Sequence, residues 1–209
     1  MKKSVKALLL TLCAVVLVVA TVFTTLAFMT SRTNTITNTF SVGNISITLD
    51  EADVDEVGVL VSTKDVRVNE NQTYKLVPGK EYVKDPTVHV TANSEDSWVF
   101  VKYTNTLEDG AIASGLTVDT ENWNELVLED VDYKVYYRQY AKNAEKVDYK
   151  LFTTDEFEVA NITGETLNTK AHDKTISVQA FAIQDDGFDN ASKAWEALKG
   201  DLPADFPQA

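Results

Sequence analysis

The chain has 209 residues, a formal net charge of −13 and one cysteine, Cys13. This length suits one domain of ordinary size. The acidic excess disfavours nucleic acid and anionic lipid as partners, and it favours solubility and basic or cation-bridged partners. A single cysteine excludes an intrachain disulfide, so stability must come from a full-sized core or from assembly.

The first predicted element is a leader. Three lysines among the first six residues precede an apolar run at 7–28, in which Ala27 is a small residue near the end. A basic head, an apolar middle and a small-residue end are typical of a secretory signal. We therefore predict a signal peptide at 1–27, cleaved between Ala27 and Phe28, and a protein secreted to the extracellular matrix or the cell surface. An uncleaved anchor is the alternative, because about 20 apolar residues can span a bilayer.

Apolar residues at two-residue spacing follow the leader, at 36–42 and again at 45–49. They occupy even positions before Gly43 and odd positions after it, so a bulge or break at Gly43 is needed to give them a common face. We predict an N-terminal arm at 28–43 and a β-sandwich domain at 44–209. The apolar residues of the arm are Phe28, Ile36, Phe40 and Val42.

The middle of the chain alternates between acidic loops and strand-like segments. Residues 50–57 are acidic and predict a loop, after which strand composition returns at 59–68 and 73–77. Pro78-Gly79 predicts a turn, since proline presets the first central dihedral and glycine accepts the positive φ of the second. Strands are expected at 87–91 and 97–103, and the second is apolar on both sides, which indicates a central strand.

The last third of the chain combines strands with helices. Residues 120–128 predict a short helix capped by Thr120, and strands are expected at 132–140 and 174–184, with shorter candidates at 150–153 and 166–167. A clearer helix is expected at 190–199, capped by Asp189 or Asn190, with Ala191, Ala194, Trp195 and Leu198 on one face.

This order of elements predicts an all-β fold, an antiparallel jelly-roll-type β-sandwich with one or two short helices.

Few residues suggest catalysis, and we assign no catalytic residue. His89 and His172 are the two histidines, and the sequence lacks His-Glu-x-x-His, Gly-x-Ser-x-Gly and phosphate-binding loop motifs. Two acidic clusters, at 50–56 and 185–189, contain oxygen ligands of the kind that calcium prefers, but neither fits the twelve-residue EF-hand pattern. We interpret them as solvated loops or, for Asp189, as a helix cap. Asp185, Asp186 and Asp189 are the calcium candidates, and no other cofactor is predicted.

Several segments together resemble the TasA/camelysin family, and they span most of the chain. They are TNTFSVGNISITL (37–49), YKLVPG (74–79), KDPTV (84–88), SEDSWVFVK (94–102) and the segment 176–188 followed by Ala194 and Trp195.

The resemblance implies a protein exported by Gram-positive bacteria and cut by a SipW-type signal peptidase. It further implies a jelly-roll subunit of biofilm-matrix or cell-surface fibres, in which the new N-terminus of one subunit fills a groove in the next. The donor strand would then be the arm, with Gly43 as its hinge. The partners implied are further copies of the chain, the signal peptidase and an accessory matrix protein. The membrane is contacted only through the signal, and nucleic acid is not a partner.

Three alternatives stay open. The arm can pair within its own domain instead of with a neighbour. The name camelysin also refers to a surface metalloendopeptidase, so the resemblance allows this activity, although the sequence offers no recognisable zinc site. A monomeric surface adhesin is the third possibility.

Overall fold

The computed structural model describes residues 30–32, 45–107 and 112–200, with the backbone alone at 30–32. The expected all-β fold is confirmed: it is an antiparallel β-sandwich of jelly-roll type, with two short helices in this part of the chain. The strands are β1 (Thr30–Arg32), β2 (Ile47–Ala52), β3 (Arg67–Val68), β4 (Glu81–Val83), β5 (Thr87–Val90), β6 (Ser97–Asn105), β7 (Ala113–Ser114), β8 (Asn124–Leu126), β9 (Lys134–Tyr140), β10 (Val147–Lys150), β11 (Glu156–Val159) and β12 (Ile176–Gln184), and the helices are α2 (Gly164–Ala171) and α3 (Ala191–Gly200).

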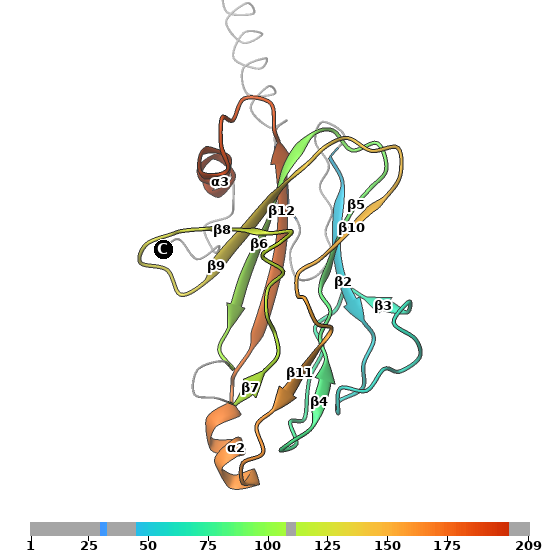
Figure 1. Cartoon of the computed structure of the whole chain (residues 1–209), viewed down its shortest axis with the longest axis vertical. Helices are drawn as coiled ribbons and strands as arrows, with labels where there is room; N and C mark the ends of the chain where they lie inside the picture. Colours follow the sequence, from blue (N-terminus) through green and yellow to red (C-terminus); the bar gives the residue numbers. More distant parts are fainter. Residues whose placement is uncertain (1–29, 33–44, 108–111, 201–209) are drawn as a thin grey trace, which may run out of the picture.

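Three sheets make up the described structure. The five-stranded sheet has the order β1-β12-β6-β9-β8, and the four-stranded sheet has the order β10-β5-β2-β3. In Figure 1 these two sheets face each other, while α3 lies against the outer side of the five-stranded sheet. The small sheet β4-β11-β7 lies at the lower end of the sandwich, near α2.

The central strand β6 contributes to two separate cores. Val99, Val101 and Tyr103 pack between the sheets, whereas Trp98 and Phe100 pack in the second core with α3. Because neighbouring side chains of a strand point to opposite faces, a strand with a core on each face is expected to carry apolar residues on both faces. This confirms the prediction of a central strand at 97–103.

The C-terminal helix packs through the face that the sequence predicts. Ala191, Ala194, Trp195 and Leu198 are its buried residues. Trp195 is fully buried, with its ring centroid 5.3 Å from that of Phe100. Asn190 caps the helix, since its Oδ1 accepts a hydrogen bond of 3.0 Å from the backbone N–H of Lys193.

Several other predictions are confirmed. Residues 47–49 belong to β2 and pair with β5, and Ile45, Ile47 and Leu49 are buried. The strands expected at 87–91, 132–140 and 174–184 correspond to β5, β9 and β12. At Pro78-Gly79 the backbone N–H of Lys80 bonds to the carbonyl of Val77 over 3.2 Å, and Gly79 has a φ of +68°.

The predictions for 50–77 need correction. The acidic stretch 50–57 is not simply a loop, because β2 continues to Ala52 and Val54 forms a bridge with Leu60. The strand expected at 59–68 is reduced to that bridge and β3. Residues 71–78 do alternate between exposed and half-buried positions, but among the described residues they have no strand partner and form an extended segment instead.

Three predictions in the second half of the chain are also wrong. The helix expected at 120–128 is one turn, in which the Asp119 carbonyl accepts from the Trp123 N–H over 2.9 Å, followed by β8. The short strand expected at 166–167 lies inside α2, where Thr163 caps the helix. The strand expected at 150–153 is found only in part, because β10 ends at Lys150 and Phe152 forms an isolated bridge with Val118.

Candidate functional site

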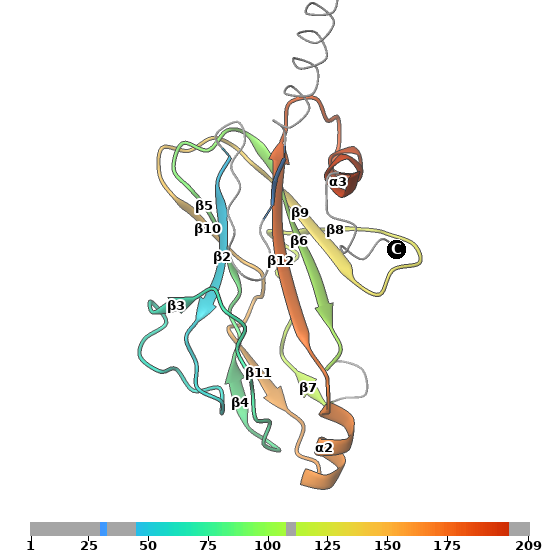
Figure 2. The ribbon, with the colours of Figure 1, turned by 180° about the vertical axis from the view of Figure 1, so that it is seen from behind.

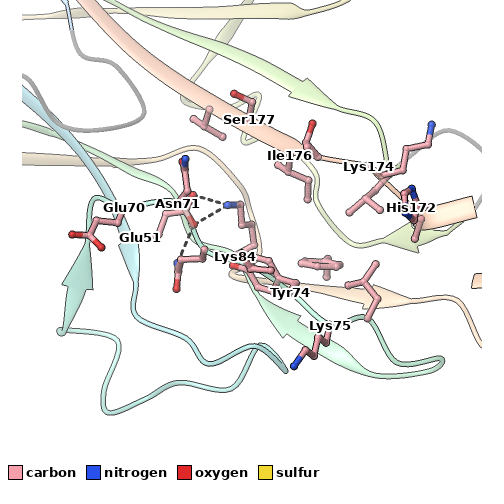
Figure 3. A pocket seen from close by; sticks show the side chains of 18 of the residues that line it. Glu51, Glu70, Asn71, Tyr74, Lys75, Lys84, His172, Lys174, Ile176 and Ser177 are labelled. Carbon is pink, nitrogen blue, oxygen red and sulfur yellow. Dashed lines mark hydrogen bonds and ion pairs between the residues drawn. The ribbon is translucent and has the colours of Figure 1, made fainter. Parts of the chain in front are cut away.

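A groove of about 990 Å³ lies between the two large sheets. One wall is formed by the beginning of β12, at Ile176–Val178, and by the end of α2. The other wall is the extended segment 71–78 together with the end of β2. Figure 3 shows Ile176 and Ser177 on one side, with Glu70, Asn71 and Tyr74 on the other.

Buried apolar side chains line the inner part of the groove. Leu49, Leu107, Phe157, Leu167 and Val178 line it and belong to the core between the sheets. They come from five different parts of the chain. The groove therefore offers an apolar interior between two extended backbones, a shape that suits an extended peptide with alternating apolar side chains.

One ion pair crosses the extended wall of the groove. The Lys84 ammonium donates to both carboxylate oxygens of Glu51, at 2.7 and 2.8 Å, and Gln72 Nε2 donates to the same carboxylate over 3.3 Å. Tyr74 lies beside this pair, with Lys84 Nζ 5.8 Å from its ring centroid. Burial raises the pKa of the Tyr74 hydroxyl, and the nearby carboxylates of Glu51 and Asp85 raise it further.

The extended wall is held by a buried tyrosine. Tyr82 is fully buried, and its hydroxyl donates to the Lys75 carbonyl over 2.8 Å and accepts from the Val77 N–H over 2.7 Å. Its ring stacks on Phe157 with 5.4 Å between centroids. A side chain from β4 thus binds the backbone of segment 71–78, which has no strand partner among the described residues.

Beyond the groove, the guanidinium of Arg67 joins β3 to β2 and to the segment 85–87 at the start of β5. It donates to Asp85 Oδ2 at 2.9 Å, to the Asp85 carbonyl at 3.0 Å and to the Asp50 carbonyl at 3.1 Å. It also donates to Thr87 Oγ1 at 3.0 Å and contacts the Asp50 carboxylate. Asp85 is buried, and its Oδ1 accepts from the Ala52 N–H over 2.7 Å.

His89 continues this network across the four-stranded sheet. Its Nε2 lies 2.8 Å from Asp50 Oδ1, and its Nδ1 lies 2.6 Å from Asp148 Oδ1. Ionised carboxylates only accept hydrogen bonds, so both ring nitrogens donate when His89 is protonated. The bond to Asp50 raises the pKa of His89, and the bond to Asp148 adds to this against the opposing effect of burial. The imidazolium therefore links β2, β5 and β10.

The same contacts act in the opposite direction on the carboxylates. Burial is the largest effect on Asp50 and raises its pKa, but hydrogen bonds from His89 and Arg67 outweigh burial and hold that pKa below its ordinary value of 3.8. Asp148 behaves likewise, since bonds from His89 and Lys146 outweigh the effect of burial. The network therefore stabilises the fold most between pH 3.8 and pH 6.5, the ordinary pKa values of aspartate and histidine.

We predict that stability falls as the pH rises past 6.5, because the proton that His89 holds more tightly in the folded state is lost there. The variant H89Q should lose about 1.5–3 kcal/mol at pH 6 and approach the wild type at pH 9, since hydrogen bonds to charged groups are worth about that much. Urea unfolding from pH 5 to 9 measures this. H172Q is the matched control, because the His172 side chain is 71% exposed. An equal pH dependence in wild type and H89Q would contradict the prediction.

The residues that the sequence singles out lie partly outside the described structure. Ala27, Phe28, Ile36, Phe40, Val42 and Gly43 all lie outside it. Of the predicted arm, 30–32 is described as β1, which pairs antiparallel with β12 of the same chain. Figure 2 shows this short blue strand beside the upper part of β12.

The three calcium candidates lie near the turn between β12 and α3. Asp185 accepts from Gln139 Nε2 over 3.3 Å, and Asp189 pairs with Lys193 on α3. Asp186 lines a shallow acidic hollow with Asp185, Glu95 and Asp96. Within 30–32, 45–107 and 112–200, no group of three or more His, Cys, Asp or Glu residues is arranged to hold a metal ion.

Among the described residues, no helix has the length and apolar character that crossing a membrane requires.

The sequence did not predict the groove or the charge network. The acidic composition predicts Asp50 and Glu51 as part of a solvated loop, whereas both are bound to cations. Arg67 and Lys84 each have an aspartate within two positions, Asp65 and Asp85, but the sequence holds no local signal that links them to Asp50 and Glu51.

Comparisons with family models, with curated proteins and with solved structures found no match to this chain.

Proposed function

We propose that this chain is a secreted structural subunit of bacterial extracellular fibres, in the biofilm matrix or on the cell surface, of the TasA/camelysin kind. After the signal is cut between Ala27 and Phe28, the arm 28–43 of one subunit pairs with the next. The observation that carries this proposal is the edge of β12 beside the groove.

Among the described residues, that edge of β12 is paired over only part of its length. β6 pairs with β12 along its whole length, from Ile176 to Gln184. On the other side of β12, the pairing within the described residues is to β1 alone, at Phe181–Ile183. The beginning of β12, at Ile176–Val178, lines the groove. A strand from another chain can add to such a sheet edge through backbone hydrogen bonds, with its side chains in neighbouring pockets.

The arm suits this groove in pattern and in charge. Its Ile36, Phe40 and Val42 lie at even positions, so an extended arm presents them on one face, toward the apolar interior. Arg32 is the only charged side chain of the arm. Of the 19 Lys and Arg, removing Arg32 and the three leader lysines leaves 15 in residues 44–209, against 32 Asp and Glu. A weakly basic arm is attracted to so acidic a domain.

The test compares purified 28–209 with 44–209 at equal concentration. We expect fibres by electron microscopy, and fast-sedimenting material, from the first protein alone. Within 28–209, F40A should assemble at least about tenfold more slowly, because a lost apolar contact of 1.4 kcal/mol is a factor of ten. T39A is the matched control on the opposite face of the arm. Equal fibres from 44–209, or a stable monomer from 28–209 at every concentration, would overturn the proposal.

A further inference from the structure

The chain's own arm already occupies part of the β12 edge. Thr30 lies opposite Ile183, Ser31 opposite Ala182 and Arg32 opposite Phe181, in an antiparallel register. The first of these residues is two positions after Phe28, the predicted start of the exported chain. The contact therefore joins the segment proposed as donor to the strand proposed as acceptor, within one molecule.

Only one strand can pair with this side of β12. Its other side is taken by β6 over all nine residues. An extended arm of 16 residues is about 53 Å long at about 3.3 Å per residue, whereas a nine-residue strand is about 30 Å long. A neighbour's arm is therefore long enough to pair along the whole of β12, and in that arrangement it covers Phe181–Ile183 and excludes the chain's own β1.

We propose that the exported subunit is capped by its own arm, and that β1 must leave β12 before a neighbour's arm can replace it. This inference rests on the proposed function and adds its regulation. A tethered segment competes at an effective concentration on the order of 1 mM, far above a micromolar concentration of free subunits. Self-pairing thus keeps the subunit monomeric when dilute and makes growth an exchange of strands.

A reversible crosslink tests the cap. Residues that lie directly opposite each other in an antiparallel pair have Cβ atoms about 4.5–5.5 Å apart, close enough for a disulfide after a small adjustment. Protein 28–209 has no cysteine, because Cys13 lies in the leader. The double variant S31C/A182C can therefore form one intramolecular disulfide, and S31C and A182C alone are the controls.

We expect the dilute double variant to oxidise to a crosslinked monomer, seen as a loss of two hydrogens by mass spectrometry and as a monomer on a non-reducing gel. The crosslinked protein should give no fibres, and reduction should restore assembly to the rate of the single variants. Absence of the intramolecular crosslink, or normal fibres from fully crosslinked protein, would overturn the cap. If the wild-type protein still formed fibres in that experiment, the proposed function would stand. Absence of fibres from wild-type 28–209 would remove both.

Discussion

Replacing Arg67 with alanine will lower the free energy of unfolding by about 3–5 kcal/mol, the cost of removing one partner from a buried ion pair. The loss is large because Asp85, whose side chain is 2% exposed, would keep only the Ala52 N–H as a hydrogen-bond donor to its carboxylate among the described residues. Asp50 also loses a cation. Urea or guanidinium unfolding at pH 6 measures the change.

Two controls separate this network from ordinary surface charge. The variant R67K should recover only part of the stability that R67A loses, since an ammonium cannot reproduce the forked contacts of a guanidinium. K142A breaks the pair between Lys142 and Glu95, whose side chains are 49% and 35% exposed, and should cost about 0–1 kcal/mol. If R67A and K142A were equally stable, the network would not hold the sheet as described.

Replacing Gly58 with alanine will destabilise the fold by about 2–5 kcal/mol, through backbone strain and overpacking together. Gly58 has a φ of +72°, and a Cβ there would lie 2.1 Å from Tyr82 Cδ1. The Tyr82 ring cannot move aside easily, because it stacks on Phe157 and its hydroxyl is bonded on both sides. Thermal or denaturant unfolding measures the loss.

Gly187 provides the matched control for this substitution. Its φ is +97°, yet an added Cβ would meet nothing within 4 Å. G187A therefore isolates the backbone cost, about 1–2 kcal/mol. A G58A variant no less stable than G187A would contradict the predicted clash with Tyr82. Because Tyr82 holds segment 71–78, we also expect G58A to be cut faster by protease in that segment.

The parts of the fold that the sequence predicts are those where the local pattern and the tertiary environment agree. β6 and β12 are long apolar runs covered on both faces, and α3 has a clear apolar stripe and a capping residue. Failures occur where distant contacts decide the structure. Residues 124–126 become β8 because β9 offers an edge, and 71–78 stays outside the sheets because Tyr82 binds its backbone.

The sequence contains a signal for only one side of the candidate site. Alternation and the leader indicate an arm, since both are local patterns. The acceptor groove combines residues near 50, 72, 167 and 177, and no local pattern connects positions so far apart in the chain. The same limit applies to the link between His89 and Asp148, which depends on the register of β5 and β10.

The two cores on either side of β6 have a consequence for how copies of this chain can join. One face of the five-stranded sheet is covered by the four-stranded sheet and the other by α3, so in the described structure neither face can stack on the sheet of another copy. Such a sheet can be extended only at its edges, by the addition of strands. The face-to-face stacking of sheets in amyloid cannot occur while the domain stays folded.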